Sequence, residues 1–291
     1  MDTLLQKVRK LEIKVKSLVD TAFAGEYQSA FRGQGLEFSE VRAYQLGDDI
    51  RSIDWNVTAR SNSVYIKQFR EEREQQIFVL FDISGSEDFG AETENKRMIG
   101  TELAAIFAFS SLRNNDRFGL ITFSNGIEQY FKPLRGRSHI MAILQGLIKA
   151  LPNSKKTDIK AAIDYYKRVQ KRKSVMILIS DFLDQGYEDS IRQLSIRHEI
   201  ILIRLYHPEE ILKASAGIIP ILDNESGIIR WVNSGGGAYR KKVGPYLKEI
   251  DTRLSQLARH KKIAYLPVDV SKDYVPVLEK FFNTRHASLK R

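Results

Sequence analysis

Two aspartates and three hydroxyl residues stand at spacings that could hold a metal ion. The stretch IFVLFDISGSEDFG begins at residue 77 and places Asp82, Ser84 and Ser86 at alternate positions after five apolar residues. A run without polar alternation is typical of a strand buried on both faces, and open α/β sheets bind ligands at the carboxyl ends of such strands. A carboxylate with two neutral oxygens suits Mg²⁺ or another hard cation. The alternative is a plain turn that Asp82 fastens by hydrogen bonds.

Two residues later in the chain could complete the same site. The stretch SVMILISDF, residues 174–182, predicts a second buried strand that ends at Asp181. If the two strands are parallel neighbours, Asp82 and Asp181 meet at one edge of the sheet. Thr157 stands before the helical pattern TDIKAAIDYY, so its hydroxyl is expected at a helix N-terminus that faces this edge. Taken alone, such a threonine is typical of a simple N-cap.

The pattern from residue 77 onward predicts strands that alternate with helices. Strands are expected at 77–81, 116–124, 174–182, 199–208 and 263–270, with 127–134 as a hairpin or edge partner. Helices are expected near 96–114, 138–151, 158–171, 188–197, 239–260 and 274–284, and residues 217–232 predict a β-hairpin. Strands separated by helices of this length predict an α/β fold, with a doubly wound, mostly parallel sheet flanked by helices.

The N-terminal quarter of the chain has a different character. Residues 2–22 repeat apolar residues at steps of three and four, which predicts a helix with a narrow apolar seam that packs on its own domain. Residues 23–76 contain short segments and turn signals, so we expect a small, irregular and partly β appendage. The predicted parts are therefore an N-terminal helix with this appendage at 1–76, and an α/β domain at 77–291.

Composition limits the class of protein. The 291 residues are 43% hydrophobic and 28% charged, which is ordinary for a globular protein. No apolar run approaches the roughly 20 residues that a membrane span needs, and charges throughout residues 1–22 argue against a signal peptide. The chain has no cysteine, which excludes disulfides, thiolate zinc sites and cysteine nucleophiles. We expect a cytoplasmic protein.

The net charge of +10 lies mostly in the C-terminal half. Residues 136–291 hold 28 basic and 16 acidic residues, whereas residues 1–76 hold 12 of each. A basic half could meet nucleic acid, anionic lipid or an acidic protein. However, the densest cluster, KRVQKRK at 167–173, also fits the last turns of a helix, where cations interact favourably with the helix dipole. The clusters lack a nucleic-acid motif and interleaved aromatic residues, so a nucleic-acid binder stays an alternative and no specific nucleic acid is expected.

A second alternative is a Mg²⁺-dependent phosphotransferase or phosphatase of the haloacid dehalogenase type. Such an enzyme also places an aspartate nucleophile after its first buried strand, but it needs a second acid two residues later as the general acid. Ser84 occupies that position in this chain. We therefore expect no enzymatic activity.

The whole constellation resembles the metal-ion-dependent adhesion site of von Willebrand factor A domains. The residues at the motif positions are Asp82, Ser84, Ser86, Thr157 and Asp181. The resemblance implies that the serines and the threonine contact a divalent cation, Mg²⁺ or alternatively Mn²⁺ or Ca²⁺, while the aspartates act through bound waters. It also implies an open coordination position for an acidic side chain of a protein partner. The loop before Thr157, NSKK, departs from the glycine-rich loop usual in that family.

The appendage carries a second and longer resemblance. Residues 35–69 closely resemble the signature of the bacterial family catalogued as domain of unknown function 58, and the resemblance extends over nearly the whole chain. The matching positions are Phe38, Arg42, Tyr44, Gly47, Asp48, Asp49, Arg51, Asp54, Trp55, Ala59, Arg60, Lys67 and Phe69. This implies a partner of MoxR-type AAA+ ATPases, and hence an adaptor in the assembly or maturation of other proteins. Among them, a charged network is expected to fix the appendage against the domain, or alternatively to form a docking surface. Its members are Asp48, Asp49, Arg51, Asp54 and Arg60.

Overall fold

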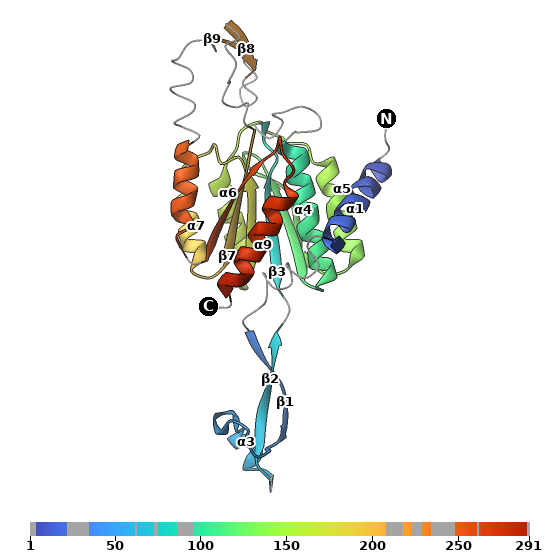
Figure 1. Ribbon diagram of the computed structural model, residues 1–291, viewed down its shortest axis with the longest axis vertical. Helices are drawn as coiled ribbons and strands as arrows, with labels where there is room; N and C mark the ends of the chain where they lie inside the picture. The colour runs from blue at the N-terminus through green and yellow to red at the C-terminus, as the bar shows by residue number, and fades with distance from the viewer. Residues whose placement is uncertain are drawn as a thin grey trace. The chain divides into compact units, whose positions relative to one another are not determined.

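The chain folds into two compact units. The computed structural model describes residues 4–21, 35–61, 63–72, 75–85, 96–207, 218–222, 229–233, 248–260 and 262–289. The larger unit consists of Met1–Ala30 and Gln76–Arg291, and the smaller unit is Phe31–Gln75. Figure 1 labels many of the elements of both units.

A six-stranded sheet forms the centre of the larger unit. Its strands are β3 (Gln76–Asp82), β4 (Arg117–Phe123), β5 (Ile127–Leu134), β6 (Val175–Ser180), β7 (Glu199–Tyr206) and β10 (Ile263–Asp269). The strand order is β10-β7-β6-β3-β4-β5, and every neighbouring pair is parallel except β4 and β5. Counted along the chain, this is the doubly wound order 3-2-1-4-5-6, whose topological switch point lies between β3 and β6. The predicted fold class and the edge position of residues 127–134 are confirmed.

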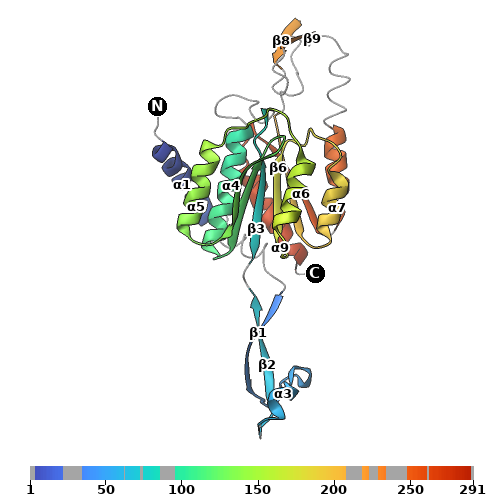
Figure 2. The same cartoon turned by 180° about the vertical axis from the view of Figure 1, so that it is seen from behind.

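Helices cover both faces of this sheet, as Figures 1 and 2 show from opposite sides. On one face, α6 (Ile159–Val169), α7 (Glu188–Ser195) and the helical residues 248–257 pack on a row of leucines, Leu80, Leu178 and Leu202. On the other face lie α4 (Lys96–Arg113), α5 (Arg137–Lys149) and α9 (Val275–Leu289), of which α4 and α9 meet at Phe107 and Phe282. Because both faces are covered, β3 and β6 consist almost entirely of buried residues. Within the described part of the chain, no helix is long and apolar enough to cross a membrane.

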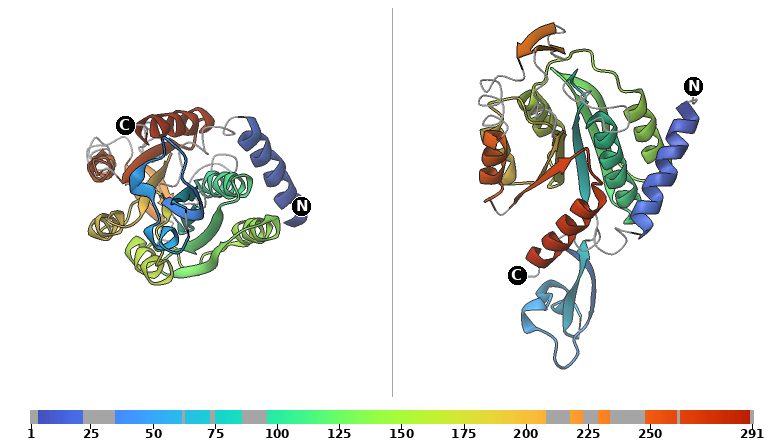
Figure 3. Two further views of the ribbon diagram at one scale, coloured as in Figure 1. Left: turned by 90° about the horizontal axis from the view of Figure 1, so that it is seen from below. Right: turned by 45° about the horizontal axis from the view of Figure 1, so that its top comes forward.

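Helix α1 (Leu4–Thr21) belongs to the larger unit. Val8 and Val15 of the predicted seam are buried, as is Val19 beside it, and the helix packs on α4 and α5. Figure 3 shows this helix beside α4. Lys14 Nζ also donates a hydrogen bond to Glu102 of α4 at 2.6 Å. The sequence-based division placed this helix with the appendage. The structure places it with the sheet, because its apolar side chains are buried against α4 and α5.

The smaller unit is built on an antiparallel ribbon of β1 (Gly35–Ala43) and β2 (Tyr65–Glu72). Between these strands lie a 3-10 turn at Ile50–Ser52 and the short helix α3 (Trp55–Thr58). The Asp54 side chain caps α3 by accepting hydrogen bonds from the N–H groups of Asn56 and Val57. Arg42 donates two hydrogen bonds to Asp48, at 2.8 and 2.7 Å. These charged residues therefore hold turns within their own unit.

A separate two-stranded sheet joins β8 (Ile218–Leu222) and β9 (Ile229–Asn233) in antiparallel register. These strands confirm the predicted β-hairpin at 217–232. The predicted turn between them and the first part of the helix predicted at 239–260 lie outside the described residues.

Candidate functional site

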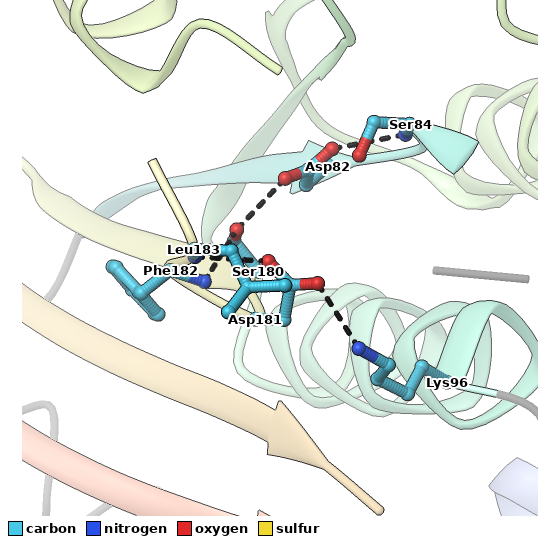
Figure 4. A network of polar contacts seen from close by, with 7 residues as sticks. All are labelled: Asp82, Ser84, Lys96, Ser180, Asp181, Phe182 and Leu183. Atoms are coloured by element: carbon cyan, nitrogen blue, oxygen red, sulfur yellow. Dashed lines mark hydrogen bonds and ion pairs between the residues drawn. The ribbon is translucent and has the colours of Figure 1, made fainter. Parts of the chain in front are cut away.

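Asp82 and Asp181 follow the two strands at the switch point of the sheet. Asp82 is the last residue of β3, and Asp181 comes directly after β6, which pairs in parallel with β3. Both residues are buried. The structure thus brings the two predicted carboxylates to one edge of the sheet, as Figure 4 shows. Sheets of this topology bind ligands at this place, and we call this edge the rim.

Hydrogen bonds hold both oxygens of Asp82. Oδ1 accepts from the Ser84 backbone N–H at 2.9 Å, and Oδ2 accepts from the Ser180 hydroxyl at 2.7 Å. Burial, and then the negative charge of Asp181, raise the pKa of Asp82 to about 7, although the hydrogen bonds from Ser84 and Ser180 favour the charged form. Without a bound cation, the Asp82 carboxyl group therefore exchanges its proton near neutral pH.

Asp181 is held in a different way, by a buried lysine. Lys96 of α4 places Nζ 3.0 Å from Asp181 Oδ2, and the two side chains are only 1% and 3% exposed. The other oxygen, Oδ1, accepts from the Leu183 N–H at 3.1 Å. Phe182, which lies between Asp181 and Leu183 in the chain, adopts φ 60°, a left-handed conformation that is rare for a bulky residue. Its N–H donates to the Ser180 hydroxyl at 3.1 Å. The turn after β6 is thus fastened by the residues of the rim.

Thr157 does not cap the helix that it precedes. Helix α6 begins at Ile159, and its N-cap is Asp158, whose carboxylate accepts from the Ala161 N–H at 2.7 Å. The expectation that Thr157 stands directly at the helix N-terminus is therefore corrected by one residue. Because Asp158 satisfies the helix end, the Thr157 hydroxyl is not needed there. Its Oγ1 is buried and has no hydrogen-bond partner among the described residues.

Backbone hydrogen bonds tie the loop that contains Thr157 to the rim. The Gly85 N–H, just after β3, donates to the Lys155 carbonyl at 3.0 Å, and the Asp158 N–H donates to the Ser124 carbonyl, just after β4, at 2.9 Å. Thr157 lies between these two anchored residues. The structure therefore supports the expected position of Thr157 at the carboxyl end of β3.

Glu128 of β5 fixes the start of the same loop. Its carboxylate accepts from the Asn153 N–H at 2.9 Å, from the Asn153 side-chain amide and from the Ser124 hydroxyl. These bonds give the sequence NSKK a defined path although it lacks the glycines of the motif that it resembles.

The donor atoms at the rim are hard oxygens. Ser84 is fully buried next to Asp82, while Ser86 lies outside the described residues, so its place in the site stays a prediction. In the part of the chain that the structure describes, no group of three or more His, Cys, Asp or Glu residues could hold a metal by itself. Carboxylates combined with the hydroxyls of Ser84 and Thr157 fit Mg²⁺ or Ca²⁺, which prefer oxygen ligands.

Two rim residues, Lys96 and Ser180, were not assigned to the site from the sequence. Ser180 is visible in the sequence as the last residue of the predicted strand, directly before Asp181. Lys96 pairs with Asp181, which is 85 residues away along the chain, and local sequence patterns cannot reveal such a pair.

The basic cluster at 167–173 lies at the carboxyl end of α6. Lys171 Nζ donates to the Lys167 carbonyl at 3.0 Å, and the Arg168 guanidinium lies 5.5 Å from the centre of the Tyr165 ring. The explanation that these cations accompany the end of a helix is confirmed for Lys167 and Arg168, which stand in its last turn.

Comparison with known proteins gives a family match and distant structural likenesses. Residues 40–249 match the family described as "Protein of unknown function DUF58". Two proteins, from Mycobacterium tuberculosis and Mycobacterium bovis and each described as an uncharacterized protein, are 32% identical to this chain over 227 residues. The match covers 77% of this chain and 71% of each relative.

The solved structures similar to this chain are related at low sequence identity. The conserved hypothetical protein BatB from Bacteroides thetaiotaomicron is 16% identical, with a TM-score of 0.46 over 73% of this chain and 98% of its own. The mussel byssus protein proximal thread matrix protein 1, described with a zinc-occupied MIDAS motif, is 15% identical, with a TM-score of 0.41 over 72% of this chain and 47% of its own. A von Willebrand factor type A protein from Catenulispora acidiphila is 12% identical, with a TM-score of 0.39 over 78% and 45%. Likeness at such identities concerns the fold alone.

Proposed function

This chain belongs to the family described as "Protein of unknown function DUF58", and from this premise we propose that it is a divalent-cation-dependent protein-interaction module. We propose further that the cation is Mg²⁺, and that the chain serves a MoxR-type AAA+ ATPase as an adaptor in the assembly or maturation of other proteins. In this role it has no catalytic activity of its own. The adaptor role follows from the family resemblance, whereas the cation follows from the rim.

The five residues of the predicted motif would bind the ion in two different ways. The hydroxyls of Ser84, Ser86 and Thr157 would contact it directly, and the carboxylates of Asp82 and Asp181 would act through water. A bound ion would supply a strongly electrophilic centre with one position left for an outside ligand. The chain itself orients the carboxylates through their hydrogen bonds and keeps them away from bulk water.

The buried hydroxyl of Thr157 is the observation that carries this proposal. A buried polar atom without a partner costs roughly 1–3 kcal/mol, so native proteins seldom keep one without a reason. Here the Thr157 oxygen, which has no partner among the described residues, lies in a loop that is hydrogen-bonded to the end of β3, the strand that presents Asp82. A metal ion at the rim would give this oxygen its missing partner.

The partner that fits such a site is an acidic protein. With few direct anionic ligands, the ion would retain charge for a Glu or Asp side chain from outside. Lys155 and Lys156 are exposed in the same loop as Thr157. Their charges would attract an acidic partner towards the rim and mainly accelerate its association.

The phosphotransferase alternative receives little support from the same geometry. Its nucleophile would be Asp82, but this side chain is fully buried and both of its oxygens already accept hydrogen bonds. The position of the required second acid is held by Ser84. These observations favour an interaction module over an enzyme.

Calorimetric titration of the full chain with Mg²⁺ and Mn²⁺ tests the proposal. Thr157→Val keeps the shape of the side chain and removes the hydroxyl, and we expect it to weaken cation binding at least tenfold. Thr122→Val is the matched control, because Thr122 Oγ1 of β4 is also buried without a partner among the described residues. Thr122 aligns with Phe81 rather than Asp82, so its side chain points to the other face of the sheet. Equal affinities in both variants and the wild type would contradict the proposed site.

A further inference from the structure

The ion pair of Lys96 and Asp181 stands apart from the other ion pairs of the described residues by its burial. Its side chains are 1% and 3% exposed, whereas the lysine of the Lys14–Glu102 pair, which also involves α4, is 53% exposed. Burying an ammonium group is costly unless it is paired. Lys96 meets this requirement at the rim through its pair with Asp181.

The packing of α4 on β3 carries Lys96 to this position. Gly100 lies one helical turn after Lys96, and a Cβ atom there would come within 2.4 Å of the Phe81 ring. A larger residue would push the first turn of α4 away from the sheet. The glycine therefore allows the close approach that brings Lys96 Nζ within 3.0 Å of Asp181 Oδ2.

Lys96 also balances the charge of the rim. Asp82 and Asp181 bring two carboxyl groups into a place that water hardly reaches, and a second buried negative charge is strongly disfavoured without a compensating cation. Lys96 supplies one positive charge and is covalently tethered to the chain. With it, each of the four oxygens of the two carboxyl groups accepts a hydrogen bond.

We infer, on the basis of the proposed cation site, that Lys96 is a built-in counter-ion of the rim: it keeps the site formed without a metal, and it weakens the binding of a free divalent cation. The tethered ammonium group repels a second cation at the same carboxylates and occupies one oxygen of Asp181. Removing the charge of Lys96 while keeping its hydrogen bond should therefore make the site bind free cations more tightly.

Titrations with MgCl₂ and MnCl₂ on full-length variants test this inference. Lys96→Gln removes the charge but can still donate an N–H to Asp181, and we expect its cation affinity to rise at least tenfold. Lys96→Arg retains the charge and should stay within about threefold of the wild type. Lys14→Gln, which removes the charge of the other lysine that bonds an acid of α4, should leave the affinity unchanged. Thermal unfolding in chelator should show that Lys96→Gln is less stable than the wild type and that added cation restores its stability.

The outcomes separate this inference from the proposed function. If the wild type binds cation and Lys96→Gln binds it equally or less tightly, Lys96 is no counter-ion, while the cation site itself stands. If only Lys96→Gln binds, the inference holds in its strongest form, since Lys96 then takes the place of the cation. If neither the wild type nor any variant binds either metal at millimolar concentration, both the proposed cation site and this inference are contradicted. If Lys96→Gln does not fold either in chelator or in metal, Lys96→Arg decides, because it retains the positive charge. A tenfold gain of cation affinity in Lys96→Arg would overturn the inference, and an unchanged affinity would support it.

Discussion

Strand β6 joins two buried polar networks that solve the problem of burial in opposite ways. Ser174 precedes the strand, and there Tyr166 Oη lies 2.5 Å from Ser174 Oγ and 3.1 Å from His198 Nδ1. Burial, and then the nearby charges of Arg197 and Lys262, lower the pKa of His198 to about 4, so this network is neutral at pH 7. At the other end of β6, Lys96 and Asp181 form a buried ion pair with Nζ and Oδ2 3.0 Å apart.

The contrast between the neutral network and the ion pair indicates which end of the sheet is arranged for a ligand. In the neutral network every member has two partners, since Ser174 Oγ and His198 Nδ1 are also only 3.0 Å apart. The loss of one group leaves the others bonded. At the rim, charge is retained at a cost that a neutral network would avoid, and a purely structural role does not require that cost. Buried charge is therefore the feature that distinguishes the proposed site from the scaffold.

The largest effect should come from removing the positive charge of the rim. We expect Lys96→Met to lower the free energy of unfolding in chelator by about 3–5 kcal/mol, because it removes the ammonium group that pairs with the buried Asp181 carboxylate. Chemical denaturation at pH 7 measures this. Lys14→Met is the control, and because Lys14 is half-exposed we expect it to cost about 1 kcal/mol or less. Equal losses in the two variants would remove the distinction between rim and scaffold.

The next effect concerns protons, which should act on the two networks in opposite directions. The pKa of Asp82 is about 7 in the folded chain, above its usual 3.8. Its contribution to stability is therefore complete below about pH 4 and is lost as the pH rises to 7. The pKa of His198 is lowered from 6.5 to about 4, so its contribution is complete above pH 6.5 and is lost as the pH falls to 4.

Asp82→Asn should isolate the part of this pH dependence that belongs to the rim. The amide cannot ionise, so in chelator the variant should be more stable than the wild type at pH 8, by up to about 4 kcal/mol for a pKa raised by about three units. The difference in stability should shrink towards zero at pH 4. The loss of stability due to His198 occurs in both proteins and therefore cancels in the difference. Denaturation curves from pH 4 to pH 8 measure it. A difference that does not change with pH would show that Asp82 does not titrate in this range.

The smallest effect should come from the neutral network. Tyr166→Phe removes the hydroxyl shared by Ser174 and His198, which can still bond each other at 3.0 Å. We expect a loss of about 1 kcal/mol in the free energy of unfolding and no change in Mg²⁺ affinity by calorimetry. A loss as large as that of Lys96→Met would mean that the two networks are equally critical.

Most of the fold could be predicted, because periodic apolar patterns report burial directly. The uninterrupted run from Ile77 to Phe81 gave a central strand, and IEQYFKPL gave an edge strand whose residues are largely half-buried or exposed. The unit to which α1 belongs could not be predicted, because a seam that contains Val8 and Val15 shows that a helix packs but does not show on which element it packs.

The candidate site was predictable only as far as strand ends determine it. Asp82 and Asp181 follow apolar runs, so their positions came from the sequence. The division of roles between Thr157 and Asp158 depends on where α6 starts, and helix boundaries are uncertain by a residue or two. Lys96 was missed because an ion pair between residues far apart in the chain leaves no local pattern.

The left-handed backbone of Phe182 has a consequence for how the sheet assembles. The residues Ile177, Leu178 and Ile179 differ little in size, so β6 could pair with β3 in more than one alignment during folding. A slip by one residue would turn every side chain to the opposite face. The positive φ of Phe182 costs about 1–3 kcal/mol, and it is offset within its own segment, where the ring packs on Tyr187 and the N–H reaches the Ser180 hydroxyl. The same hydroxyl donates to Asp82 of β3, a bond that requires the native alignment. The turn at Phe182 therefore holds Ser180 ready for a contact that a misaligned strand would lose.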